Sequence, residues 1–212
     1  MMKTVTLYRG CMQVLVSLML AACLCSCLPK LLPGVAPTLV RLNPAMPGNM
    51  SDGQSKQQIT VAIPQLAQDI DNDRITVILK GREVRQLSGA RWSTGLGGVM
   101  NDSIVKALES TQAFAGVGGE VDGLVSQRRL NSEISLFALE YASETDSPKA
   151  RFSAVFRLLD ARQAKIVATR QVDVSVPAAG TDTTALVNAL EQALEKGLAE
   201  MSAWVVANRH VK

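Results

Sequence analysis

The sequence has little cysteine and histidine, and the positions of these residues exclude most of the chemistry they support. All four cysteines stand at or before Cys27, and the one histidine is His210, near the C-terminus. The chain beyond Cys27 therefore has no thiol for a cysteine nucleophile, a zinc ribbon or a disulfide. A catalytic triad or a histidine metal site would have to use His210, where chain ends fray. We expect no catalytic residue, no metal site and no cofactor, and hence no enzyme.

Glycine-rich and acidic segments are present, but none completes a ligand-binding pattern. Residues 95–98 and 116–119 lack the G-x-x-x-x-G-K-[ST] and G-x-G-x-x-G spacings that bind phosphates, so we interpret them as turns or close-packing positions. Residues 69–73 read D-x-D-x-D, yet Arg74 follows where an EF-hand calcium loop needs glycine. We interpret this acidic segment as a solvated turn before a strand.

An excess of charge of one sign is also missing. Lys plus Arg is 22 and Asp plus Glu is 19, which gives a net charge of +3. Lys3 and Arg9 are the charged residues of the first 22, so removing that segment leaves 20 basic and 19 acidic residues. No basic field suggests a nucleic-acid partner. Apolar residues, at 47% of 212, are sufficient for a packed core and favour one ordinary domain.

The N-terminus has the pattern of an export signal. Lys3 and Arg9 precede residues 11–22, which are almost wholly apolar. This apolar run is shorter than the about 20 residues that a transmembrane helix needs. A positive segment followed by a short apolar one is typical of a secretory signal peptide. We predict that residues 1–22 are the signal peptide.

The end of this segment resembles a bacterial lipobox, the recognition site of lipoprotein signal peptidase, and consists of Leu20, Ala21, Ala22 and Cys23. The small alanines suit a tight protease pocket, and the Cys23 thiol is the atom that would receive a diacylglyceryl group. Two alternatives are an ordinary secretory signal and a second cleavage site before Cys27. Cys25 and Cys27 are left as free, acylated or paired.

Acylation at Cys23 would hold the chain permanently on a membrane. Each buried methylene contributes about 0.8 kcal/mol, so one chain binds marginally, whereas the two or three chains of a mature lipoprotein do not release. Leu24 stands where aspartate would favour inner-membrane retention in enteric-type bacteria, so this sorting rule implies the periplasmic face of the outer membrane. Residues 23–37 hold three prolines and predict an extended tether.

The remaining chain, residues 38–212, predicts a mixture of strands and helices. Short β-branched runs predict strands over residues 38–42, 59–63, 75–79, 83–87 and 113–117. Longer, partly alternating segments predict an antiparallel meander over residues 131–142, 150–160 and 165–176. Apolar residues at helical spacing predict one helix over 94–110 and another from a cap at 180–183 to about Asn208.

These elements favour an α/β domain, with α+β as the alternative. We expect a layered domain whose mixed, largely antiparallel sheet is covered by the two main helices. The two tryptophans, Trp92 and Trp204, lie beside the predicted helices. We interpret both as core anchors, with a lipid or partner contact as the alternative.

The ordered set of motifs resembles the ABC-type transport auxiliary lipoprotein family, the lipoprotein component of MCE-type lipid transport systems. It comprises the lipobox at Cys23, T-L at Thr38, I-x-V-x-x-P from Ile59, D-N-D-R-I over 71–75, A-R-W over 90–92 and A-L-V-x-A-L from Ala185. The similarity covers roughly residues 20–207, and Cys23 is the one site residue that it transfers.

The resemblance implies a fold similar to the N-terminal domain of TolB and a non-enzymatic role on the outer-membrane side of a periplasm-spanning assembly. There the chain would dock or receive a lipid conduit and support membrane integrity. The implied partners are an MCE-domain protein, an ABC permease/ATPase complex, a bound phospholipid and further copies of the chain in a ring. The alternative is an outer-membrane lipoprotein adaptor for envelope assembly or peptidoglycan synthase activation.

Overall fold

The computed structural model describes residues 36–50, 53, 55–143 and 146–211. The chain divides into two units, Met1–Ala36 and Pro37–Lys212, and the fold below is that of the second. Its elements in chain order are β1 (Thr38–Val40), β2 (Gln58–Val61), β3 (Gln65–Leu66), β4 (Arg74–Leu79), β5 (Glu83–Trp92), α2 (Leu96–Ser110), β6 (Gly116–Gly119), the 3-10 turn η1 (Glu120–Asp122), β7 (Arg128–Tyr141), β8 (Lys149–Asp160), β9 (Lys165–Pro177) and α3 (Thr183–Ala207).

All the described strands form one mixed sheet arranged around β7. One edge of β7 pairs antiparallel with β8 over twelve residues, and β8 pairs in the same way with β9. The other edge is shared by β2, β3 and β4, which pair parallel with successive parts of β7 over two to four residues each. Beyond these strands lie β6 on one side and β5 and β1 on the other. The predicted meander over β7, β8 and β9 is confirmed.

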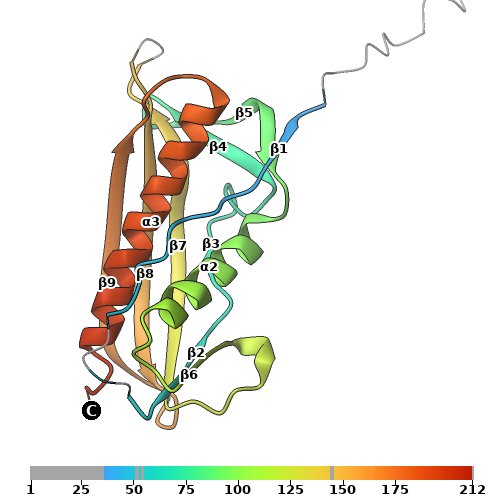
Figure 1. Ribbon diagram of the computed structural model, residues 1–212. Helices are drawn as coiled ribbons and strands as arrows, with labels where there is room; N and C mark the ends of the chain where they lie inside the picture. The colour runs from blue at the N-terminus through green and yellow to red at the C-terminus, as the bar shows by residue number, and fades with distance from the viewer. Residues whose placement is uncertain (1–35, 51–52, 54, 144–145, 212) are drawn as a thin grey trace, which may run out of the picture. The chain divides into compact units, whose positions relative to one another are not determined.

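The helices cover one face of this sheet, as Figure 1 shows. Helix α3 packs on β8 and β9, while α2 packs on β6 and β2 and contacts α3. Residues of β8 that face the helices are buried, and those between them are partly exposed: Ala150, Phe152, Ala154, Phe156 and Leu158 form the buried set. This alternation gives an antiparallel strand one core face and one solvated face. The predicted layered, mixed α/β fold is confirmed.

Helix α3 begins at the predicted cap. The Asp182 carboxylate accepts a hydrogen bond from the Ala185 backbone N–H at 3.0 Å, which satisfies one of the free amides of the first turn. The predicted apolar stripe is buried throughout, and it consists of Leu186, Val187, Leu190, Leu194, Leu198, Met201 and Val205. Burial of this stripe against β8 and β9 supplies the main stabilisation of the helix.

An aromatic cluster in the core links residues of three strands. Trp92, 3% exposed, stacks on Phe137 with ring centroids 5.9 Å apart. Phe137 in turn meets Phe152 edge-on at 6.2 Å. Offset-stacked and edge-to-face pairs stabilise beyond the area they bury. The prediction that Trp92 is a core anchor is confirmed, and Trp204 packs half-buried against the same core.

Several strand boundaries differ from the predictions. The strand predicted over 113–117 begins instead at Gly116, because Ala113 and Phe114 serve as buried side chains of the connection. The strand predicted over 38–42 ends at Val40, whose carbonyl accepts from the Ser93 backbone N–H at 2.7 Å. The strand predicted over 83–87 continues to Trp92. The two-residue strand β3 was not predicted, since so short a run carries no period.

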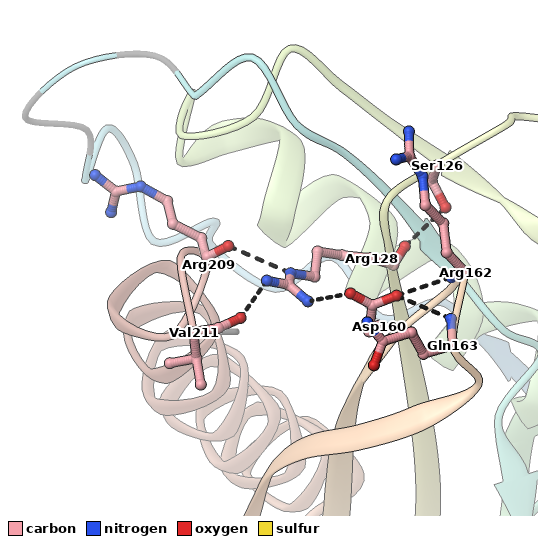
Figure 2. Close-up of polar contacts among 7 residues, drawn as sticks. All are labelled: Ser126, Arg128, Asp160, Arg162, Gln163, Arg209 and Val211. Atoms are coloured by element: carbon pink, nitrogen blue, oxygen red, sulfur yellow. Dashed lines mark hydrogen bonds and ion pairs between the residues drawn. The ribbon is translucent and has the colours of Figure 1, made fainter.

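A buried arginine ties the end of α3 to the sheet. Arg128, 4% exposed, donates from Nε to the Arg209 carbonyl at 3.3 Å and from Nη2 to the Val211 carbonyl. Its Nη1 lies 3.5 Å from a carboxylate oxygen of Asp160. Figure 2 shows the guanidinium between the C-terminal turn and the β8–β9 turn. This one side chain satisfies carbonyls that follow the helix and would otherwise lack a donor.

Asp160 is itself held by the turn it begins. Its carboxylate accepts from the Gln163 backbone N–H at 3.0 Å and from the Arg162 backbone N–H at 2.9 Å. The pKa of Asp160 is lowered, chiefly by the bond from Gln163, with the Arg162 amide and the Arg128 and Arg162 charges acting in the same direction. The carboxylate therefore stays ionised opposite Arg128 over the ordinary pH range.

Gly197 sets how closely α3 approaches β8. A Cβ added there would lie 2.4 Å from Cδ1 of Phe152, a fully buried ring. We predict that Gly197→Ala lowers the free energy of unfolding by about 1–3 kcal/mol, because the helix or the ring must move. Chemical denaturation followed by circular dichroism measures the change.

Gly98 in α2 is the matched control. A Cβ there would meet nothing within 4 Å. Gly98→Ala should therefore leave stability unchanged or raise it by up to about 1 kcal/mol, since alanine restricts the unfolded chain. Equal effects of the two substitutions would contradict the close-packing argument.

Candidate functional site

The predicted lipidation site lies outside the described residues. This applies to Leu20, Ala21, Ala22 and Cys23, and also to the tether up to residue 35. The structure does describe the segment that follows the predicted tether. Neither helix in the described part of the chain is long and apolar enough to cross a membrane.

An extended segment, residues 41–50, crosses the helical face of the domain, and we name it the anchor-side strap. It follows β1 and runs between α3 and α2, in blue in Figure 1. Its residues alternate at first: Arg41, Asn43 and Ala45 are exposed, whereas Leu42 and Pro44 are buried. The strap thus inserts apolar side chains into the helical layer although it belongs to no sheet.

Two glutamates on α3 hold the strap by its backbone. Oε1 of Glu191 accepts a hydrogen bond from the Asn43 N–H, and Oε1 of Glu195 accepts from the Ala45 N–H at 2.8 Å. The glutamates are four residues apart, so they lie one above the other on the helix. The amides two residues apart point the same way along an extended segment. The two spacings match, which makes the pair of carboxylates a clamp for the strap.

Further backbone hydrogen bonds fix the chain after the strap begins. The Met50 N–H donates to the Thr111 carbonyl at 3.1 Å, just beyond the end of α2. The Ser55 N–H donates to the Ala113 carbonyl, also at 3.1 Å. The strap is therefore attached to α3 along its first half and to the end of α2 at its last residue.

A hollow of about 280 Å³ lies between the strap and α2, and we name it the strap pocket. Its walls come from the strap, from the turn before α2 and from one side of α2: Arg41, Leu42, Asn43, Pro44, Met46, Ser93, Thr94, Val99, Asp102, Ser103 and Lys106. The lining combines apolar side chains with two cations and one acid. This combination suits an amphipathic ligand better than a purely apolar one.

Two other hollows differ in character. One of about 530 Å³ lies beside the end of α2, between Asn49, Glu109 and Val117. Another of about 230 Å³ lies where β2 gives way to β3, and its arginines are already paired. Arg129 contacts Glu120 at 2.6 Å and Arg157 contacts Glu133 at 3.1 Å. The hydrogen bond from Arg129 is the main reason that the pKa of Glu120 is lowered.

An exposed apolar surface stands beside the edge strand β6. It consists of Ile63, Val121 and Val125, which are 59%, 83% and 85% exposed, and we name it the apolar tip. The strand predicted over 59–63 included Ile63, but β2 ends at Val61. No role was predicted for Val121 and Val125, because isolated valines in a loop carry no periodic signal.

The loop that carries the apolar tip is held in place by hydrogen bonds. The Gly119 N–H donates to an Asp122 carboxylate oxygen at 2.6 Å, and Gly123 takes the left-handed conformation at φ 66°. The Thr60 hydroxyl donates to the Ser126 hydroxyl at 2.8 Å and lies 3.3 Å from the Leu124 carbonyl oxygen. Val121 and Val125 are therefore exposed on a fixed loop, which lowers the entropy lost on binding.

The acidic segment over residues 69–73 forms a turn before β4. Asp73 pairs with Arg91 at 3.3 Å, and the Asp69 carbonyl accepts from the Thr76 hydroxyl at 3.0 Å. Across residues 36–50, 53, 55–143 and 146–211, no group of three His, Cys, Asp or Glu side chains could hold a metal ion. The glycine-rich segments open α2 and form β6.

The clamp generates a test. We predict that the double substitution Glu191→Ala and Glu195→Ala speeds amide hydrogen exchange of the strap by about fivefold or more, because each charge-assisted hydrogen bond contributes about 1.5–3 kcal/mol. Exchange in β7 and β8 should not change. Mass spectrometry of peptides that cover residues 41–50 measures both.

The matched control is Glu191→Gln with Glu195→Gln. Glutamine keeps an acceptor oxygen at the same reach, so the strap should exchange more slowly than in the alanine variant. If the strap exchanges at the same rate in the unaltered protein, the alanine variant and the glutamine variant, the glutamates do not hold it.

Similarity to known proteins indicates the family of this chain. The chain matches the family model described as "ABC-type transport auxiliary lipoprotein component" over residues 41–202. A crystal structure of a DUF330 protein from Xanthomonas campestris is similar, with 28% identity and a TM-score of 0.75 over 81% of this chain and 96% of that one. The crystal structure of an uncharacterized protein has 13% identity and a TM-score of 0.64, over 80% and 99% of the two chains. No curated protein matches the chain.

The matched residues run from the first residue of the strap into the last part of α3, and so include every described strand except β1, all of α2, most of α3 and the clamp. The resemblance that the sequence motifs predicted is confirmed. This chain belongs to the ABC-type transport auxiliary lipoprotein component family.

Proposed function

We propose that the protein is a non-enzymatic lipoprotein of the outer membrane that serves an MCE-type, ABC-driven intermembrane lipid transport system. Membership of the auxiliary lipoprotein family over residues 41–202 carries this proposal. The lipobox residues before Cys23 support attachment to a membrane, and Leu24 supports the periplasmic face of the outer membrane as its location. In this role the domain docks or receives the periplasmic lipid conduit and carries out no chemical step.

The apolar tip is the surface that we assign to docking. Exposed apolar groups that gather on one surface mark interaction sites more often than scattered ones do. Glu120 and Asp122 flank Val121, so carboxylates stand beside the apolar side chains. Glu120 is paired with Arg129, whereas the Asp122 carboxylate would repel anionic lipid head groups, which favours a protein partner over the bilayer surface. The partner on this proposal is the MCE-domain protein, with the ABC permease and ATPase further along the assembly.

The anchor gives the first test. Cys23→Ala should abolish incorporation of labelled palmitate and release the protein from the membrane fraction, because the acceptor thiol is lost. Cys27→Ala is the matched control and should keep both properties. Density-gradient separation of inner and outer membranes then locates the labelled protein. Full labelling of Cys23→Ala, with loss in Cys27→Ala, would move the site to Cys27.

The docking surface gives the second test. Protein purified from intact envelope in mild detergent should retain the MCE-domain protein and the permease. Val121→Asp with Val125→Asp should reduce this recovery about tenfold or more, because central apolar contacts each contribute about 1–2 kcal/mol. The control is Val84→Asp with Ile166→Asp, which changes two other exposed apolar residues, 51% and 49% exposed, and should retain the partners.

A different partner would decide against this assignment. Recovery of a peptidoglycan synthase, with unaltered lipid traffic in a deletion strain, would favour the envelope-assembly adaptor instead. Undiminished recovery of the MCE-domain protein by the tip variant would place docking elsewhere on the domain.

A further inference from the structure

The strap pocket has an unequal charge lining. Arg41 on the strap and Lys106 on α2 supply two cations, and Asp102 supplies one acid. Within the part of the chain that the structure describes, Arg41 and Lys106 make no ion pair and no side-chain hydrogen bond. The hollow beside β3 is different, because Glu120 and Glu133 already neutralise its two arginines. The strap pocket thus keeps a positive charge available for a ligand.

The other side of the strap pocket is apolar. Leu42, 7% exposed, and the buried Pro44 come from the strap, and the half-buried Met46 and Val99 come from the strap and α2. The Ser103 hydroxyl donates to the Val99 carbonyl at 2.7 Å, so it is already used within the helix. A ligand that fits would place an anion at Arg41 and Lys106 and carbon against the apolar wall.

We propose that the strap pocket binds the head group of an anionic phospholipid, with the phosphate at Arg41 and Lys106 and the glyceryl carbons against Leu42, Met46 and Val99. Arginine binds phosphate oxygens through two parallel N–H groups, and lysine adds a point charge. The Asp102 carboxylate disfavours a bare second anion but accepts from a hydroxyl on the head group. The choice of a lipid as the source of the phosphate rests on the proposed function.

The size of the strap pocket limits what it holds. At about 280 Å³ it lies just below the usual range of ligand pockets, about 300–1,000 Å³. It therefore accommodates a head group and the first carbons beyond it, while the acyl chains stay outside. Because one wall is the strap, the glutamate clamp on α3 also keeps Arg41 in place.

Native mass spectrometry of the acylated full chain in detergent tests this assignment, since each bound phospholipid adds a resolvable mass. The probe is dioleoylphosphatidylglycerol, compared with dioleoylphosphatidylcholine and with glycerol 3-phosphate. We expect a one-to-one adduct with phosphatidylglycerol and weaker binding of the other two. Arg41→Gln with Lys106→Gln should weaken the adduct about tenfold or more, since a hydrogen bond to a charged group is worth about that factor.

The matched control is Arg82→Gln with Lys165→Gln, which removes the same charge at exposed positions outside the pocket and should bind as the unaltered protein does. Unfolding midpoints of both variants show whether each is folded. Unchanged binding by Arg41→Gln with Lys106→Gln overturns the assignment, as does the absence of any adduct. If glycerol 3-phosphate binds as tightly as phosphatidylglycerol, the ligand is not a lipid and the pocket is a site for a free phosphate compound. Absence of the adduct from the unaltered protein, together with recovery of its partners, would refute the pocket and leave the proposed function intact.

Discussion

The backbone hydrogen bonds along the two edges of β7 are the constraint on which the rest of the domain depends. One edge carries the long antiparallel partner β8, and the other is divided among three short parallel strands. Parallel neighbours cannot be joined by tight turns, so the chain must cross over the sheet between them. Helix α2 lies within such a connection and meets α3 on the same face. The junction of the two helices is the place where the strap lies and the strap pocket forms.

The opposite face of the meander is polar and carries ion pairs in place of helices. Arg151 lies 2.7 Å from Asp173 and 3.3 Å from Glu140, and it links all three strands across this face. Exposed pairs of this kind contribute about 0–1 kcal/mol each, so their main effect is to keep the face hydrated. The two proposed binding surfaces accordingly lie on the helical side and at the edge strand. The strap pocket and the apolar tip are separate surfaces, and the two proposals place a lipid and a protein on them.

Sequence reasoning predicted the meander and both helices because their signals are local. Alternation along β8 and the stripe on α3 each repeat within a few residues, and Asp182 is an ordinary cap. The sheet order was not accessible, since β7 pairs with strands far apart in the chain. The clamp was missed for the same reason: Glu191 and Asn43 are 148 residues apart, and an acid on an exposed helix face looks like any other surface charge. The residues of the apolar tip show no sequence periodicity, so only the exposure of their side chains in the structure identified them.

The anchor-side strap gives the domain a mechanical property. If residues 23–37 form the predicted tether, tension on it would act first on β1, which pairs with β5 through three residues, and then on the two glutamate-held amides. Both are weaker than the twelve-residue pairing of β7 with β8, so the strap would peel before the sheet opened. Release of the ten residues of the strap would lengthen the connection between the tether and the domain by about 30 Å. The domain could follow a moving partner over that distance while its core stays folded.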